Sequence, residues 1–75
     1  MTDDKALQAA REEVYRWQTN PKADWFTAKL LSLMAKADAL NSIKLGVVYP
    51  YEQQAYLEWL NSPSSDECFK NWGLK

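Results

Sequence analysis

The sequence predicts a small all-α protein, an orthogonal bundle of three main helices with two short ones. Apolar residues recur at spacings of three and four along most of the chain, and prolines divide it into helix-length segments. The only β-like run, residues 47–49, is too short to build a sheet alone and predicts an extended connector. The sequence contains no internal repeat, low-complexity tract or linker, so we expect residues 1–75 to form a single helical domain.

The first main helix is predicted over residues 3–18. Leu7 and Val14 lie on one stripe of this segment, and we assign them to the core. Thr2 is the candidate N-cap. The helix should end before Pro21, because proline fixes its own φ and disfavours helical backbone at the residue before it.

Residues 22–37 are the most apolar segment and predict the central helix. Asp38 is the candidate N-cap of a short helix that follows, and Gly46 is expected to close it in a left-handed conformation. One apolar face runs through both segments, formed by Phe26, Leu30, Leu33, Ala37 and Leu40 and widened by Leu31 and Met34. We assign Leu30, Leu33 and Leu40 to the core.

The third main helix is predicted over residues 50–61, after the connector. Its packed face should hold Tyr56, Leu57 and Leu60, with Trp59 at the edge. A capping box follows, with serine at the N-cap and glutamate three residues later, and it predicts a last short helix. This helix begins at Ser64, carries Phe69 and Trp72 and ends at Gly73.

Charge and cysteine content exclude several classes of protein. Nine basic and ten acidic residues give a net charge of −1, whereas a general nucleic-acid binder normally carries a positive excess. No apolar segment approaches the ~20 residues that span a bilayer, and Met1 is followed by Thr2, Asp3 and Asp4 rather than by a leader pattern. The lone Cys68 allows no internal disulfide. We therefore expect a cytoplasmic protein that binds neither membranes nor nucleic acids in general.

The residue types present argue against catalysis. Histidine is absent, which removes the commonest general base and the commonest metal ligand. The adjacent acidic pairs point about 100° apart on a helix, so we interpret them as complements of the helix dipole or as solvated charges. Cys68 is interpreted as a small core residue beside Phe69. We expect no enzyme, no catalytic or metal-binding residue and no cofactor.

Aromatic residues are the unusual feature, at 13% of the chain. Each needs roughly 150–250 Å² of cover, more than so small a body supplies for all of them. Tryptophan and tyrosine dominate binding hot spots, so part of this set is expected to form a protein-binding face. The candidates are Trp17, Trp25, Tyr49, Tyr51, Trp59 and Trp72.

Two alternatives to a hetero-partner stay open. A core of this size seldom contributes more than roughly 3–5 kcal/mol of net stability, so we expect self-association into a dimer or larger oligomer, and a structural or assembly role of that homo-oligomer is the first alternative. A sponge for a small ligand such as a signalling nucleotide would need aromatic stacking and cations at a subunit junction. The available cations are Arg11, Arg16, Lys22 and Lys29.

Part of the chain resembles short uncharacterised helical proteins of bacteriophages and prophages. The matching residues lie between Phe26 and Trp59: Phe26, Lys29 to Leu31, Leu33, Ala35 to Asp38, Asn41, Leu45, Tyr49, Pro50, Glu52, Ala55, Tyr56 and Trp59. The family pattern usually has proline and phenylalanine where this chain has Ala39 and Tyr49. The resemblance implies a phage or prophage origin and supplies no activity. Combined with the aromatic set, this origin leads us to expect a small phage-encoded accessory protein that binds and modulates a host or viral protein through an aromatic-rich face, in the host cytoplasm.

Overall fold

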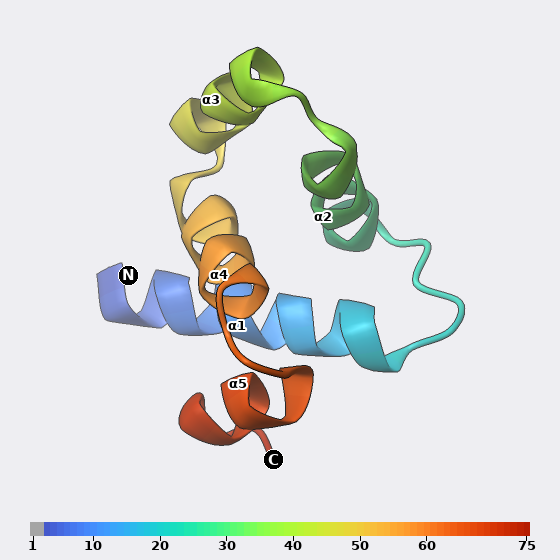
Figure 1. Ribbon diagram of the computed structural model, residues 1–75, viewed down its shortest axis with the longest axis vertical. Helices are drawn as coiled ribbons and strands as arrows, with labels where there is room; N and C mark the ends of the chain where they lie inside the picture. The colour runs from blue at the N-terminus through green and yellow to red at the C-terminus, as the bar shows by residue number, and fades with distance from the viewer. Residues whose placement is uncertain (1–2) are drawn as a thin grey trace.

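The computed structural model describes residues 3–75 and confirms the all-α class. Over these residues the chain forms helices and no strand (Figure 1): α1 (Asp3–Thr19), α2 (Phe26–Lys36), α3 (Ala39–Val48), α4 (Pro50–Leu60) and α5 (Ser65–Asn71). The three main helices α1, α2 and α4 pack against one another, while α3 and α5 lie chiefly against α4. The predicted N-cap Thr2 lies outside the described residues.

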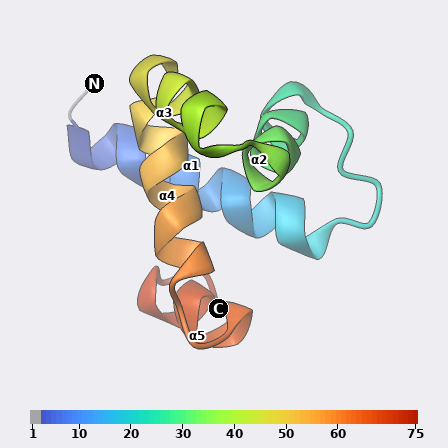
Figure 2. The ribbon, with the colours of Figure 1, turned by 45° about the horizontal axis from the view of Figure 1, so that its top comes forward.

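Both other main helices, α2 and α4, pack against the long helix α1. Helix α4 crosses over it, and α2 approaches it from the same side (Figures 1 and 2). Helices α2 and α3 occupy one end of the molecule and α5 the other (Figure 1). The fold therefore has two ends of different construction, joined by the crossing of α1 and α4.

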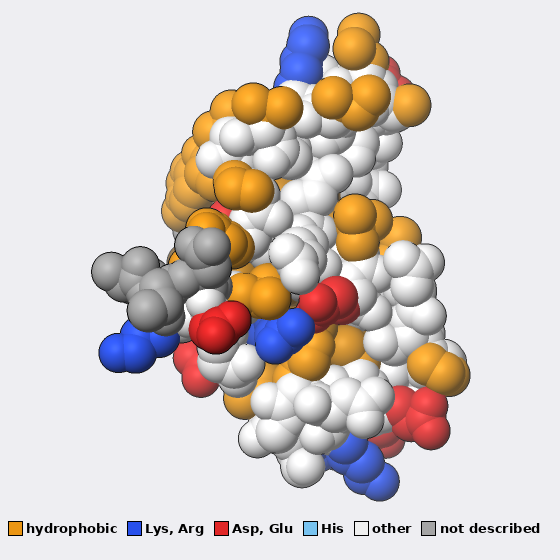
Figure 3. Space-filling model, turned by 90° about the vertical axis from the view of Figure 1, so that its left-hand side faces the viewer, with side chains coloured by type: hydrophobic (Ala, Val, Ile, Leu, Met, Phe, Trp, Pro, Cys, Tyr) orange, Lys and Arg blue, Asp and Glu red, His pale blue; other side chains and the backbone are white. Residues whose placement is uncertain are grey.

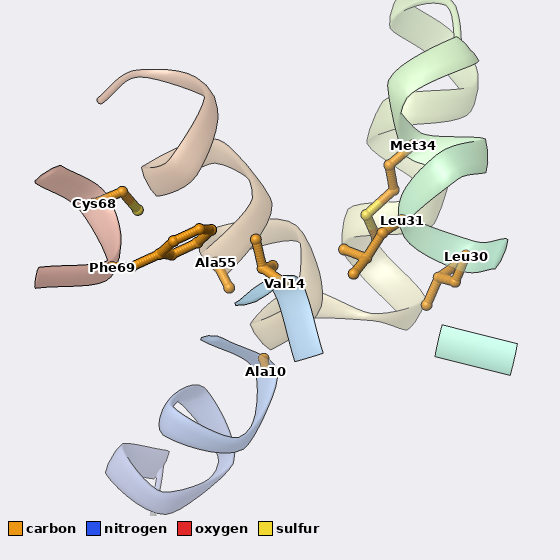
Figure 4. Packing of buried hydrophobic residues seen from close by; sticks show 8 residues of the cluster. All are labelled: Ala10, Val14, Leu30, Leu31, Met34, Ala55, Cys68 and Phe69. Carbon is orange, nitrogen blue, oxygen red and sulfur yellow. The ribbon is translucent and has the colours of Figure 1, made fainter. Parts of the chain in front are cut away.

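The core lies where α1, α2, α4 and α5 meet. Val14, Leu31 and Ala55 are fully buried, and small alanines at the helix crossings let the backbones approach closely. Leu31 points toward Val14 from α2, whereas Phe69 reaches toward Ala55 from α5 (Figure 4). Cys68 is also buried, so its side chain is part of this core as expected.

Three capping devices predicted from the sequence are confirmed. The Asp38 side chain accepts a hydrogen bond from the Asn41 backbone N–H at 2.8 Å and caps α3. Ser64 accepts from the Glu67 backbone N–H at 3.2 Å and caps α5. Gly73 follows α5 with φ of 77°, the left-handed conformation that glycine adopts without a steric penalty.

Two predicted helix boundaries are wrong. Helix α2 begins at Phe26 rather than at residue 22, because the Asn20 side chain accepts from the Lys22 backbone N–H at 3.0 Å and holds a turn there. Gly46 does not close α3. It lies inside that helix, where an added Cβ would stand 3.0 Å from the end of the Gln53 side chain, so the missing Cβ leaves room for the Gln53 amide.

The β-like run at residues 47–49 is not a connector. Val47 and Val48 form the last turn of α3, and the Tyr49 backbone N–H donates to the Leu45 carbonyl at 2.7 Å. Pro50 then starts α4 at once, so Tyr49 caps both helices. The β-branched residues are tolerated because helix propensity is a weak preference that tertiary packing overrides.

The predicted core stripe is also partly wrong. Leu30 is buried, but Leu33 is 55% exposed, and Phe26 and Leu40 are more exposed still. Helix α2 buries Ala28, Leu30, Leu31 and Met34, so the residues predicted to widen its apolar face, Leu31 and Met34, belong to the core. Because α3 packs chiefly against α4, it leaves the Leu33 side of α2 open.

Helix α4 shows the same kind of rotation. Ala55 is its buried residue, with Tyr56 and Trp59 packed beside it against the core. Leu57 and Leu60, predicted on the packed face, are exposed. The small side chain of Ala55 permits the close crossing with α1, and this sets which face of α4 is covered.

Candidate protein-binding surface

Helix α3 is apolar, yet none of its residues is buried. Its solvent side, which we call the α3 outer face, is formed by Leu40, Ile43, Val47 and Val48. These four side chains are between 63% and 76% exposed. Single exposed apolar residues are ordinary, whereas contiguous apolar sets on one helix are typical of surfaces that bind another molecule.

A groove with a largely apolar lining lies between α2 and α3. We call it the α2–α3 groove. It consists of two adjoining hollows of about 290 and 310 Å³ that share Leu33 and Leu45. Phe26 and Tyr49 line one end, with ring centroids 6.2 Å apart, and Ala37 and Asn41 line the other.

Lysines border this groove. Lys29 and Lys44 each line one of its hollows, and Lys36 lies beside Leu33 in the next depression along α2. The segment 26–48 carries these three lysines and one acidic residue, a charge of 3 − 1 = +2. The rest of the chain carries six basic and nine acidic residues, a charge of 6 − 9 = −3. The acidic residue in the segment, Asp38, caps α3.

The space-filling view shows the same division from another side. In Figure 3, hydrophobic side chains cover much of the upper part of the face, at the end of the molecule where Figure 1 places α3. Most of the carboxylates in this view lie in the lower half, toward α1 and α5. On this face, most of the carboxylates therefore lie away from the apolar side chains at the α3 end.

All four tryptophans among the predicted binding residues are half-buried and use their indole N–H within the chain. Trp17 donates to Ser32 Oγ at 3.0 Å and Trp59 to Ser65 Oγ at 3.0 Å. Trp25 donates to Glu13 Oε2 at 2.8 Å, and Trp72 donates to Glu58 Oε1 at 3.2 Å. Each bond joins a tryptophan to a different segment, so these rings hold the bundle together.

Two of the predicted tryptophans are brought together. The ring centroids of Trp17 and Trp59 are 5.4 Å apart in an edge-on arrangement, and Tyr56 lies 5.9 Å from Trp59. Aromatic pairs at such distances contribute about 0.5–1.5 kcal/mol beyond their burial. This cluster joins α1 to α4, and the binding role of its members stays a prediction.

The other predicted aromatics are dispersed. Tyr49 lines the α2–α3 groove, whereas Tyr51 packs against the core. Trp25 lies under the Arg16 guanidinium, 4.9 Å from the ring centroid, and Trp72 packs 6.0 Å from Phe69. The six candidates therefore do not form one face, and of the six only Tyr49 lines the groove.

Two of the cations considered for a nucleotide site are engaged within the chain. Arg11 forms a bidentate ion pair with Glu58, and its guanidinium also lies 5.9 Å from the Trp72 ring centroid. Hydrogen bonding to Arg11 holds the pKa of the Glu58 carboxyl below its ordinary range and raises the pKa of Arg11. Arg16 pairs with Glu13 at 3.3 Å.

Residues 3–75 contain no group of three or more acidic or cysteine side chains placed to hold a metal ion. Over the same residues no helix has the length and apolarity needed to cross a bilayer.

Sequence reasoning missed the residues that form the exposed surface. The composition of α3 could have revealed this surface, because residues 39–48 contain six apolar side chains, one charged side chain and no acidic one. A helix apolar on every side within a small protein has more apolar surface than its neighbours can cover. Ending the helix at Gly46 separated Val47 and Val48 from Ile43 and concealed their common face.

Comparison with known proteins adds no relative. No protein-family model matches the chain, and searches of curated proteins and of solved structures find no significant match.

Proposed function

We propose that this protein is a non-enzymatic accessory protein that binds and modulates another protein through the α3 outer face and the α2–α3 groove. The observation that carries the proposal is that α3 exposes four large apolar side chains and buries none. Removing such surface from water contributes about 25 cal/mol per Å². A partner that covers it would thus add stability that a 75-residue core lacks.

This proposal moves the contact surface away from the six aromatic residues named from the sequence. The four tryptophans among them use their indole N–H groups inside the bundle, and Tyr51 packs against the core, so truncating these residues would loosen the fold. Tyr49 is the exception, because it lines the groove beside Phe26.

A hetero-partner is favoured over a second copy by charge. A two-fold symmetric contact through this surface would bring Lys29, Lys36 and Lys44 of one chain toward the same lysines of the other. Like charges at an interface oppose association. A nucleotide sponge is disfavoured because Arg11 and Arg16 already have partners.

The resemblance of residues 26–59 to short phage proteins supports a phage or prophage origin for this protein. Both groove helices lie within that stretch. We place the protein in the cytoplasm of a phage-infected or lysogenic bacterium, with a host or viral protein as its target.

The test is differential affinity capture from a bacterial lysate. A double variant, Ile43→Ser with Val47→Ser, removes half of the α3 outer face while keeping similar helix propensity. Leu60→Ser is the matched control, because Leu60 is similarly exposed on α4 outside the groove. We expect the wild type and the control to retain a partner that the double variant loses.

Two outcomes would contradict the proposal. Capture of the same partners by the double variant would remove the α3 outer face from the interface. The surface would instead be assigned to self-assembly by a second combination of results. In that case, light scattering shows a closed oligomer, the double variant abolishes it, and no protein is captured from the lysate.

A further inference from the structure

We infer that the α2–α3 groove receives an amphipathic helix of the partner, with an apolar stripe flanked by aspartate and glutamate. This inference rests on the proposed function and specifies the chemistry of the partner. It is carried by the shape of the groove and by the charges along its two rims.

The groove has the length that a helix needs. Helices α2 and α3 flank it, with Phe26 beside Tyr49 at one end and Ala37 and Asn41 lining the other. Eleven residues separate Phe26 from Ala37, which corresponds to about 16 Å at 1.5 Å per residue, or about three helical turns. A helix lying in it would place side chains at i, i+3 or i+4, and i+7 into the hollows.

The groove is concave and apolar where such anchors would enter. Leu33 and Leu45 belong to both hollows, and Leu30 contributes to one of them beside Phe26. Helix-in-groove recognition uses this arrangement, with apolar anchors from one face of the ligand. A flat bilayer surface would cover the convex α3 outer face and leave these hollows empty.

The rims determine the charge of the ligand. Lys29 and Lys36 stand seven residues apart on α2, two helical turns and so about 10 Å, while Lys44 stands on the α3 side. None of the residues lining the two hollows is acidic. A ligand helix with carboxylates along its flanks would face a lysine on each side, which raises association rate and fixes orientation.

A displayed peptide library provides the probe. Peptides of about 18 residues would carry leucine at helical i, i+3 and i+7 positions, with all other positions randomised. Selection on the full-length protein should enrich sequences with aspartate and glutamate beside the leucine stripe. A labelled winner should bind about tenfold more weakly to the variant Lys29→Glu, Lys36→Glu, Lys44→Glu, from three partly screened ion pairs.

Control variants separate local from general charge effects. Lys22→Glu with Lys70→Glu changes the net charge in the same direction at positions outside the groove, and should leave the affinity within about twofold. Leu33→Ala should weaken the peptide while leaving the fold intact, because Leu33 is exposed.

Several results would overturn the inference. Enriched peptides that are neutral or basic, or binding indifferent to the three lysines, would exclude an acidic helix. Lysine-dependent sedimentation with phosphatidylserine vesicles, without any enriched peptide, would assign the groove to a membrane surface. If lysate capture still depends on Ile43 and Val47 but not on the lysines, the proposed function stands and this inference falls.

Discussion

Arg11 of α1 and Glu58 of α4 form a bidentate ion pair, with Nε 2.8 Å from Oε1 and Nη2 3.0 Å from Oε2. The Trp72 indole, just after α5, donates to the same carboxylate at 3.2 Å. One side chain of α4 therefore joins three segments that are far apart in the sequence. The paired geometry matters because bidentate arginine–carboxylate bonds fix orientation as well as contributing energy.

Replacing Glu58 with glutamine should destabilise the fold by about 1 kcal/mol at neutral pH. The pair is partly exposed, so water screens it and the loss stays well below that of a buried pair. Because the pKa of Glu58 is lowered in the folded state, its contribution is complete above the ordinary value of about 4.3 and is lost as pH falls below that value. Thermal melts from pH 7 to pH 3 measure both effects.

The exposed Glu12 provides the control for this experiment. Glu12→Gln should melt like the wild type at neutral pH, and the stability gap between Glu58→Gln and the wild type should narrow in acid. A gap that stays constant down to pH 3 would mean that the ion pair contributes nothing through its charge.

Leu31→Ala and Leu33→Ala should differ sharply although the two residues are neighbours in α2. Leu31 is fully buried between α2 and α1, so truncation should cost about 2–5 kcal/mol through lost burial and the cavity left behind. Leu33 is 55% exposed, and its truncation should change the free energy of unfolding by about 0.5 kcal/mol or less. Chemical denaturation of the two variants provides the comparison. Equal losses would place Leu33 in the core.

The residues 31 and 33 also show how far the sequence could lead. Periodicity located α2 and its apolar character, and capping chemistry located the starts of α3 and α5 at Asp38 and Ser64. These are local properties, set by side chains within a few residues of one another. These features can therefore be predicted without knowledge of the neighbouring helices.

Which side of a helix faces the core depends on the neighbouring helices, so it could not be predicted from the sequence. Helix α2 has apolar side chains over more than half its circumference, so several rotations satisfy its pattern equally well. In the structure, α4 packs on α1 with Ala55 buried, and α3 packs against α4 rather than over Leu33. The exposed surface is thus a consequence of packing between distant segments.

Trp59→Ala should lower the free energy of unfolding by about 2 kcal/mol. The ring is half-buried between Trp17 and Tyr56, so the loss should fall below that of a fully buried tryptophan. Trp59→Phe keeps a ring in place but removes the bond to Ser65, and should cost about 1 kcal/mol. Urea unfolding monitored by circular dichroism distinguishes the three proteins. A wild-type midpoint for Trp59→Ala would restore this residue to the candidate binding set.

Asp38→Ala should loosen α3 in preference to the rest of the fold. The variant loses the side-chain acceptor for the Asn41 N–H, which costs about 1 kcal/mol of helix stability. Helix α3 buries no residue, so it has little packing to offset that loss and should open locally. Amide hydrogen exchange should therefore accelerate about fivefold in residues 41–48 while the core amides of α1 are unchanged.

Two variants serve as controls. Asp38→Asn keeps the acceptor oxygen and should exchange like the wild type, whereas Ser64→Ala should accelerate exchange in α5 alone. Because α3 forms one wall of the groove, Asp38→Ala should also weaken any ligand bound there. If exchange rises equally in α1 and α3, the molecule opens as one unit and α3 is not an independently mobile wall.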